Sequence, residues 1–207
     1  MQAELSKVIA ALDEFYAREE FLFEKDLGER ALTHRFAVYL ERQFPELATD
    51  CHYDRLGERV LKLPRGSIVA SDDHLCRSIY PDIAVHRREI PDNLLAIEIR
   101  KATNHTSLDH DQHKLRALTD SRSWFAYGIG VMLVLGKDGV TVSEIYSGGA
   151  LEPKQTAWFS ERLSEAGHRA APPELALSDI ERVPTAPAAM PSEDHAAGAA
   201  AIASSSN

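Results

Sequence analysis

The chain has 207 residues, of which 44% are hydrophobic and 27% are charged, and its formal net charge is -9 at neutral pH. This length and composition are typical of one domain with a hydrophobic core and some extensions. The acidic balance argues against a protein that binds polyanions by overall charge, but it is compatible with an enzyme whose basic cleft is local.

No segment of the sequence predicts export or membrane insertion. Residues 1–7 lack the basic segment and apolar core of a signal peptide. No apolar run approaches the roughly 20 residues of a membrane-spanning helix. Cys51 and Cys76 do not make a disulfide framework. We therefore expect a cytoplasmic protein with reduced thiols and no membrane partner.

The first 44 residues predict two amphipathic helices. In residues 2–25, one stripe carries apolar side chains at helical spacing, namely Leu5, Val8, Ile9, Leu12, Phe15 and Tyr16. This helix is expected to pack on the domain, and contact with a second copy, in a homodimer or larger assembly, is the alternative. A second helix is predicted from about Glu29 to Phe44. Helical spacing puts Glu29 on its apolar stripe, although the helix macrodipole also explains a Glu there.

Short strands are predicted next. Residues 48–62 alternate between polar and apolar side chains around Gly57, which is typical of an edge hairpin. Residues 64–79 predict a loop with one short strand at 68–70.

A helix is predicted over residues 107–120. Asp111 lies three residues after Leu108 and four before Leu115, so it is expected to point inward or toward a cleft. Lys114 is expected either on the solvated face of this helix or in an ion pair with Asp111.

The C-terminal part predicts two strands, a helix and a tail. Residues 124–135 are apolar and predict a central strand that is buried on both faces. Residues 140–146 predict the returning strand, and residues 155–166 predict an amphipathic helix. Residues 168–207 are rich in Ala, Pro and Ser and are expected to be disordered, apart from a short turn near 175–180.

These elements predict an α/β fold with a mixed central sheet flanked by helices. We divide the chain into an N-terminal amphipathic helix over residues 1–27, a folded domain over 28–167 and a tail over 168–207.

The strongest functional signal lies in residues 80–101. Two apolar runs, 83–85 and 94–99, flank a polar connection and predict a β-hairpin. Each run carries one carboxylate, Asp82 at the start of the first strand and Glu98 inside the second. A buried ionised carboxylate costs several kcal/mol unless a cation compensates it. Two such carboxylates in one hairpin predict a divalent metal site.

The residues around the hairpin supply what phosphodiester cleavage needs. Asp82, Glu98 and the carbonyl of Ile99 are hard oxygen ligands, which suit Mg²⁺ or Mn²⁺. Arg100 or Lys101 would place a positive charge near the scissile phosphate.

Strand periodicity separates the two candidate cations. Glu98 and Arg100 share one face of the strand, and Lys101 points to the other face unless the strand is bulged. Arg is effectively always protonated, so Arg100 can clamp a phosphate but cannot act as a general base.

Pro81-Asp82 and Glu98-Ile99-Arg100 resemble the two motif elements of the PD-(D/E)XK nuclease superfamily, with Arg100 in place of the usual Lys. Residues 29–35 resemble the glutamate-bearing first helix of that superfamily. Asp111-x-x-Lys114-Leu115 resembles the helix after its motif. The likeness covers about residues 28–146.

This resemblance implies a restriction-endonuclease-like αβββαβ core and a metal-dependent nuclease, with DNA favoured over RNA as the nucleic-acid partner. It implies a Mg²⁺ (or Mn²⁺) site formed by Glu29, Asp82, Glu98 and the carbonyl of Ile99. The catalytic residues it implies are Asp82, Glu98, Arg100 and Lys101. Because the usual Lys helps to activate the attacking water, Arg100 makes a slow or silent member the alternative.

Two other interpretations compete. The first is zinc binding by the His-, Cys- and Asp-containing segments 51–52, 74–76 and 109–113, but none has the spacing of a zinc site. The second is a binding or scaffold module on the same fold, in which the carboxylates are structural.

Overall fold

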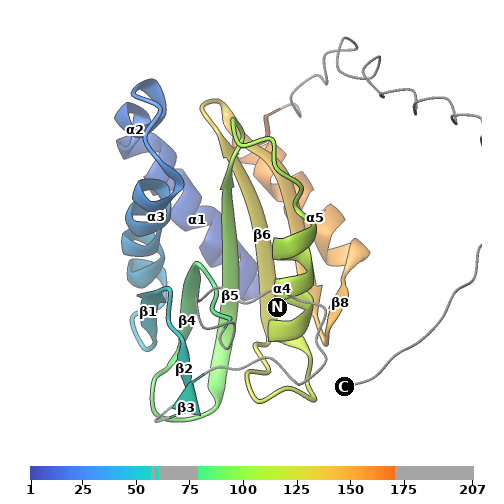
Figure 1. Cartoon of the computed structure of the whole chain (residues 1–207). Coiled ribbons are helices and arrows are strands. Elements are labelled where there is room, and N and C mark those ends of the chain that lie inside the picture. Colours follow the sequence, from blue (N-terminus) through green and yellow to red (C-terminus); the bar gives the residue numbers. More distant parts are fainter. Residues whose placement is uncertain (57–58, 61–78, 171–207) are drawn as a thin grey trace, which may run out of the picture. The chain divides into compact units, whose positions relative to one another are not determined.

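A mixed six-stranded sheet forms the centre of the fold (Figure 1). The computed structural model describes residues 1–56, 59, 60 and 79–170. The strands follow in the order β1 (Ala48–Cys51), β4 (Ile83–Arg87), β5 (Asp92–Lys101), β6 (Ile129–Gly136), β7 (Gly139–Ser147) and β8 (Ala150–Leu151). β5 and β6 are parallel, and the other neighbouring strands are antiparallel. The expected α/β fold with a mixed sheet is therefore confirmed.

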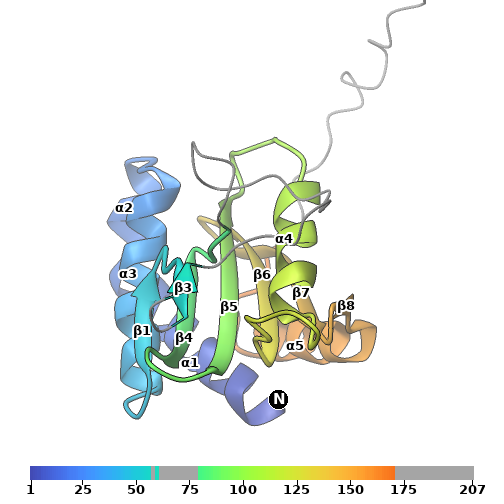
Figure 2. The ribbon, with the colours of Figure 1, turned by 60° about the horizontal axis from the view of Figure 1, so that its bottom comes forward.

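Helices cover both faces of this sheet. One face packs against α1 (Gln2–Arg18), α3 (Glu29–Gln43) and α5 (Pro153–Glu165), and the other packs against α4 (Asp109–Thr119). The short helix α2 (Glu20–Glu24) joins α1 to α3. Figure 2 shows α4 on one side of the strands and α1 and α5 on the other.

The alternation of side chains in β5 divides the core into two layers. Leu95, Ile97 and Ile99 are buried on the side of α1, α3 and α5, whereas Ala96 is buried on the side of α4. Glu98 and Arg100 share the parity of Ala96 and therefore belong to the α4 side. The first helix α1 contributes Leu5, Val8, Leu12 and Phe15 to the larger of the two layers, so it is part of the same core.

The helix expected over residues 2–25 is interrupted at Glu19. The carboxylate of Glu19 accepts a hydrogen bond from Arg35 Nε at 2.7 Å and another from the Tyr39 hydroxyl. These contacts with α3 fix Glu19 in a non-helical conformation (φ -117, ψ 26) between α1 and α2. The prediction of one continuous helix was wrong because a tertiary contact decides this position.

The hairpin expected over residues 48–62 is also only partly correct. Residues 48–51 form β1, the edge strand of the main sheet, which pairs with β4. Asp50 on β1 contacts His86 Nε2 at 3.0 Å and accepts two hydrogen bonds from Arg88. A hairpin remains only in the two-residue strands β2 (Arg55–Leu56) and β3 (Arg59–Val60). The strand expected at 68–70, Cys76 and the tail beyond residue 170 lie outside the described residues. Residues 168–170, which were expected to belong to the disordered tail, are instead hydrogen-bonded to Val140 of β7.

The strand expected over residues 124–135 is shorter than predicted. β6 begins only at Ile129, and its side chains are buried up to Leu135. The preceding residues form a loop that contains Ala126 at a φ of 38°. The prediction of a buried central strand is therefore confirmed from Ile129 onward. The apolar residues before Ile129 belong to the loop.

The tight turn between β6 and β7 gives a stability prediction. Gly139 has a φ of +131°, and a Cβ atom there would lie 2.5 Å from the carbonyl oxygen of His168. Gly139→Ala is therefore expected to lower the free energy of unfolding by more than about 2 kcal/mol. Gly148→Ala is the matched control, since Gly148 also has a positive φ (+59°) but has no atom within 4 Å of the added Cβ. Urea unfolding of both variants measures the difference, and equal losses would contradict the steric explanation.

In the described part of the chain, no helix combines the length and apolar character needed to cross a bilayer.

Candidate active site

The candidate site begins where β4 ends beside β5. Ile83 is the first residue of β4 and lies opposite Ile97, so the β4 ladder does not reach Ile99. The side chain of Asp82 replaces a strand partner for Ile99, because Asp82 Oδ2 accepts a hydrogen bond from the backbone N–H of Ile99 at 2.9 Å. Asp82 precedes Ile83, the partner of Ile97, and therefore lies next to Glu98; Lys114 of α4 acts on both carboxyl groups. The predicted pair of carboxylates is thus brought together by neighbouring strands.

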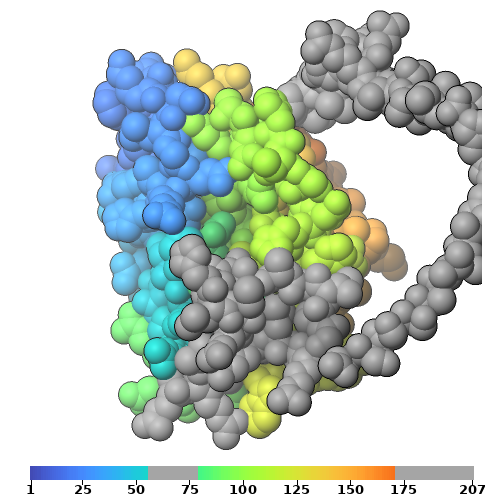
Figure 3. Space-filling model, in the orientation of Figure 1, coloured from blue at the N-terminus to red at the C-terminus, as the bar shows by residue number. Residues whose placement is uncertain are grey.

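Glu29 binds the same edge of β5 two residues further along the strand. Its Oε1 atom accepts hydrogen bonds from the backbone N–H of Lys101 at 3.1 Å and from Asn104 Nδ2 at 2.8 Å. The start of α3 is thereby tied to the segment after β5, and Figure 3 shows these two segments in contact at the surface. The N–H and C=O of one strand residue point to the same side, so the carbonyl of Ile99 also faces this edge.

Glu98 is buried in an ion pair that the sequence did not predict. Its side chain is 2% exposed, and Lys114 Nζ lies 2.8 Å from Glu98 Oε2. The other carboxylate oxygen, Oε1, is buried and has no hydrogen-bond partner among the described residues. The expectation that Lys114 lies on a solvated helix face was wrong, since its side chain is only 5% exposed.

Arg100 lies on the same face as Glu98, as strand periodicity predicted. Its Nε atom lies 2.6 Å from Asp111 Oδ2, and its NH1 atom donates to the Thr106 hydroxyl. Asp111 is buried, which confirms that it points inward from α4. The ion pair with Asp111 holds the guanidinium of Arg100 beside the first turn of α4. The carboxylates of Glu29 and Asp82 are near enough to act on its charge.

Lys101 points away from this cluster. Its Nζ atom donates to the carbonyl oxygen of Leu27 at 2.8 Å and lies 2.5 Å from Asp26 Oδ1. No bulge interrupts the pairing of β5 with β6 from Leu95 to Lys101. The side chain of Lys101 therefore anchors the α2–α3 connection, and only its backbone N–H belongs to the candidate site.

The cluster holds more negative than positive charge. In formal charges, four carboxylates face two cations, namely Glu29, Asp82, Glu98 and Asp111 against Arg100 and Lys114. Burial raises the pKa of Glu98 well above its ordinary value, with Lys114 opposing and Asp82 reinforcing the shift. Burial likewise raises the pKa of Asp82, and Lys114 and the Ile99 N–H oppose it. With all groups ionised the excess is two negative charges, and the raised pKa values of Glu98 and Asp82 show that burial favours their neutral forms when no further cation is present.

The donor set fits a hard divalent cation in its chemistry. Carboxylate oxygens and a backbone carbonyl are the ligands that Mg²⁺ and Mn²⁺ prefer, and the buried Oε1 of Glu98 lacks a partner in the described part of the chain. Among those residues, however, no three His, Cys, Asp or Glu side chains already stand close enough together to hold an ion. Metal binding would therefore require the Glu29, Asp82 and Glu98 side chains to adjust.

His52 is a neighbour of Asp82 that was not expected at this site. Its Nδ1 atom lies 3.8 Å from Asp82 Oδ1, and its backbone N–H donates to the Asp82 carbonyl at 3.1 Å. The φ of His52 is +51°, an uncommon value for a residue other than Gly. The sequence suggested His52 only as a zinc ligand beside Cys51 and offered no reason to place it near Asp82. Lys114 was detectable, because it lies three residues after the inward-facing Asp111 and four before the buried Leu118.

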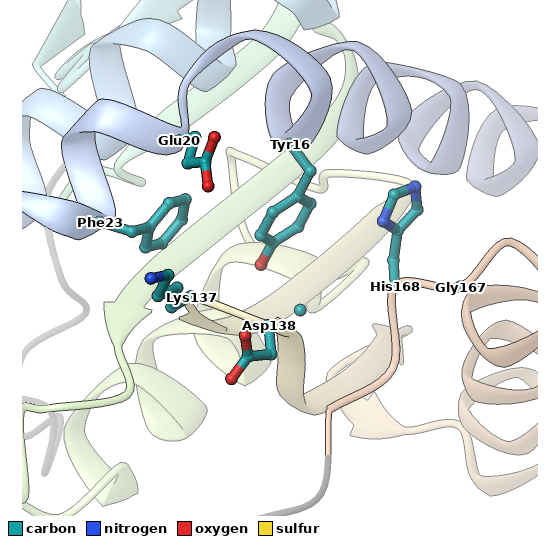
Figure 4. Close-up of a pocket in the computed structure, with 8 residues that line it drawn as sticks. Tyr16, Glu20, Phe23, Lys137, Asp138, Gly167 and His168 are labelled. Atoms are coloured by element: carbon teal, nitrogen blue, oxygen red, sulfur yellow. The ribbon is translucent and has the colours of Figure 1, made fainter.

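A separate cavity of about 220 Å³ lies between α1, α2 and the β6–β7 turn (Figure 4). The Tyr16 ring is stacked between Phe23 and His168, and its hydroxyl points toward the turn that carries Asp138. His168 also contacts Asp13 of α1. None of the predicted site residues lines this cavity, so the end of β5 remains the candidate active site.

Comparisons with protein-family models, with curated proteins and with solved structures found no match to this chain.

Proposed function

We propose that this chain is a metal-dependent nuclease of the PD-(D/E)XK type that hydrolyses phosphodiester bonds, with DNA as the favoured substrate. The observation that carries the proposal is the hydrogen bond that holds Asp82 at the Ile99 N–H, next to Glu98, with Glu29 at the same strand edge and with Arg100 and Lys114 beside them. Carboxylates together with cations are what a metal-assisted attack on a phosphate requires.

The order of elements supports the restriction-endonuclease-like core within this proposal. A helix that begins with Glu29 is followed by the main-sheet strands β1, β4 and β5, then by α4 and β6, while the short strands β2 and β3 between β1 and β4 form a separate sheet. This order agrees with the αβββαβ arrangement implied by the motif resemblance. Asp82 immediately precedes β4, and Glu98 lies inside β5, as the two motif elements require.

In the proposed reaction, Asp82, Glu98 and Glu29, together with the carbonyl of Ile99, would hold Mg²⁺ or Mn²⁺. A divalent ion there supplies charge neutralisation and a polarised water. The chain's own groups bind and orient the phosphate. Arg100 can donate hydrogen bonds to a phosphate oxygen from the N–H groups that Asp111 and Thr106 leave over.

Lys114 would take the place of the Lys that the motif lacks. It approaches Glu98 from α4 rather than from β5, but it brings an ammonium group to the same carboxylate. A Lys can orient a water and exchange a proton with it, which Arg100 cannot do. Lys101, included among the expected catalytic residues, is not part of the proposed machinery because its side chain binds the α2–α3 connection.

A non-catalytic binding or scaffold module is the second candidate. It is favoured by the hydrogen bonds of Asp82 and Glu29 to the backbone N–H groups of Ile99 and Lys101. In this alternative the carboxylates cap the free edge of β5 and need no metal. The pairs of Lys114 with Glu98 and of Arg100 with Asp111 would then be purely structural.

Nicking of supercoiled plasmid in Mg²⁺ or Mn²⁺ distinguishes the two candidates. Wild-type protein is expected to nick, and Asp82→Asn is expected to abolish nicking. Glu144→Gln is the matched control, because Glu144 lies on the same sheet face two strands from Glu98, bonded to Gln112 and Tyr146. Nicking that persists in Asp82→Asn, or that disappears equally in Glu144→Gln, would contradict the proposed site.

A further inference from the structure

Lys101 places a positive charge in a largely apolar layer. It follows Ile97 and Ile99 on the face of β5 that packs against α1, α3 and α5, and its side chain is only 10% exposed. Removing an ammonium group from water is costly, and its ion-pair partner Asp26 is 73% exposed, so this pair offsets little of that cost. An apolar side chain would suit the position better, and the charge therefore calls for a reason other than stability.

Lys101 holds two points of the segment that leads into α3. Its Nζ atom donates to the carbonyl oxygen of Leu27 at 2.8 Å, and its backbone N–H donates to Glu29 Oε1 at 3.1 Å. Leu27 and Glu29 flank Gly28, the residue before α3. One residue at the end of β5 thus fixes both the backbone path into the helix and the carboxylate of the first helical residue.

The segment that Lys101 holds is exposed to solvent and contains a glycine. Residues 24–28 are all exposed. Gly28 has an extended backbone, with a φ of -67° and a ψ of 158°, and a Cβ atom there would meet no described atom within 4 Å. A Gly at such an open position leaves the backbone more conformational freedom than any other residue would. A contact from outside the segment is therefore needed to keep the Glu29 carboxylate at the edge of β5.

The backbone of Lys101 also joins Glu29 to the Arg100 side of the site. Its carbonyl oxygen accepts a hydrogen bond from the Asn104 N–H at 2.9 Å, and Asn104 Nδ2 donates to Glu29 Oε1 at 2.8 Å. Asn104 Oδ1 accepts from the Thr106 hydroxyl at 2.9 Å, and this hydroxyl is in turn the partner of Arg100. A displacement of the segment before α3 would therefore reach the guanidinium as well as the carboxylate.

We propose that Lys101 is a positioning residue: its ammonium group holds the carbonyl of Leu27 so that the carboxylate of Glu29 stays at the β5 edge, where a divalent ion would bind. The proposal rests on the proposed nuclease function and assigns to Lys101 a role that acts through Glu29, without contact with the water or the phosphate. Groups that orient a metal ligand typically change metal affinity by a factor of about 10 to 100.

Amide hydrogen exchange of the metal-free protein tests the positioning without any reaction. Two N–H groups at the β5 edge report on two carboxylates, since Glu29 holds that of residue 101 and Asp82 holds that of Ile99. Lys101→Met keeps the side-chain length but removes the donor. In this variant, protection of amide 101 is expected to fall at least about tenfold, while protection of amide 99 should stay unchanged. Lys101→Arg, which can still donate to Leu27, should restore most of the protection at 101.

Calorimetric titration with Mn²⁺ tests whether Lys101 acts through Glu29. Lys101→Met should weaken binding about tenfold, but it should have no further effect in a Glu29→Gln background, because residues that act through one group are not additive. Lys137→Met is the matched control, since Lys137 lines the same small cavity as Lys101 but is exposed on the β6–β7 turn. It should leave both Mn²⁺ binding and the protection of amide 101 unchanged.

Unchanged protection of amide 101 in Lys101→Met, equal losses at amides 99 and 101, or fully additive effects of Lys101→Met and Glu29→Gln would overturn the proposal. Plasmid nicking by the wild type together with unchanged protection in Lys101→Met would reject the positioning role and leave the nuclease assignment standing. Selective loss of protection at amide 101 without nicking by the wild type would support the positioning role and reject the nuclease.

Discussion

Lys114→Met is expected to lower the free energy of unfolding by about 3 kcal/mol, because it leaves the carboxylate of Glu98 buried without its cation. The two side chains are 5% and 2% exposed, and their charged atoms lie 2.8 Å apart. Adding Glu98→Gln to Lys114→Met should recover most of the loss, since it removes the unpaired charge. Urea unfolding of both variants in the absence of metal measures the effect.

Arg42→Met is the control for this prediction. Arg42 and Glu14 are also 2.8 Å apart but 52% and 35% exposed, so their loss should cost no more than about 0.5 kcal/mol. If the double variant were as unstable as Lys114→Met alone, the unpaired charge of Glu98 would not be the cause of the loss.

The cost of Lys114→Met should also increase with pH. Burial raises the pKa of Glu98 well above its ordinary value, and Lys114 opposes that shift. Glu98 therefore releases its proton at a higher pH in the folded protein than in the unfolded chain, where the ordinary pKa is about 4.3. A carboxyl of this kind destabilises the fold progressively as pH rises from the unfolded pKa to the folded pKa. Without Lys114 the folded pKa rises further, so the loss should be larger at pH 8 than at pH 5.

Glu98→Gln alone is expected to reduce plasmid nicking about a thousandfold while raising the midpoint of thermal unfolding of the metal-free protein. Losing one metal ligand forfeits several kcal/mol of transition-state stabilisation. The midpoint of thermal unfolding should rise, because the substitution removes a desolvated carboxylate from a cluster with excess negative charge. In the Glu98→Gln variant, the neighbouring carboxylate of Asp82 still compensates the positive charge of Lys114.

These opposite directions separate a catalytic role from a structural one. A carboxylate kept for stability should lose stability when it is replaced, whereas one kept for chemistry can gain it. Thermal unfolding and nicking rates of wild type, Glu98→Gln and Glu144→Gln provide the comparison. A lower midpoint for Glu98→Gln would favour the structural alternative.

The sequence was sufficient to predict the direction of a side chain where the geometry of a single strand or helix determines it. The period of two in β5 correctly placed Arg100 with Glu98 and turned Lys101 away, and the helical period correctly buried Asp111. These predictions need only the geometry of a strand or a helix.

The sequence was insufficient where two distant elements meet. Lys114 lies on the inward stripe of α4, but its partner Glu98 belongs to β5, and no spacing rule connects them. The break at Glu19 depends on Arg35 and Tyr39 of the following helix. In the same way, the loop around Trp124 depends on Asn93 from β5, which binds a carbonyl that a continuous strand would have used.

Calorimetric titration with Mn²⁺ is the most direct test of the claim that Asp82 and Glu98 form a metal site. We expect wild-type protein to bind Mn²⁺, Glu144→Gln to bind it equally well, and the double variant Asp82→Asn, Glu98→Gln to bind it at least about a hundredfold more weakly. Equal Mn²⁺ binding by wild type and the double variant, or no binding by wild type, would show that Asp82 and Glu98 do not form a metal site.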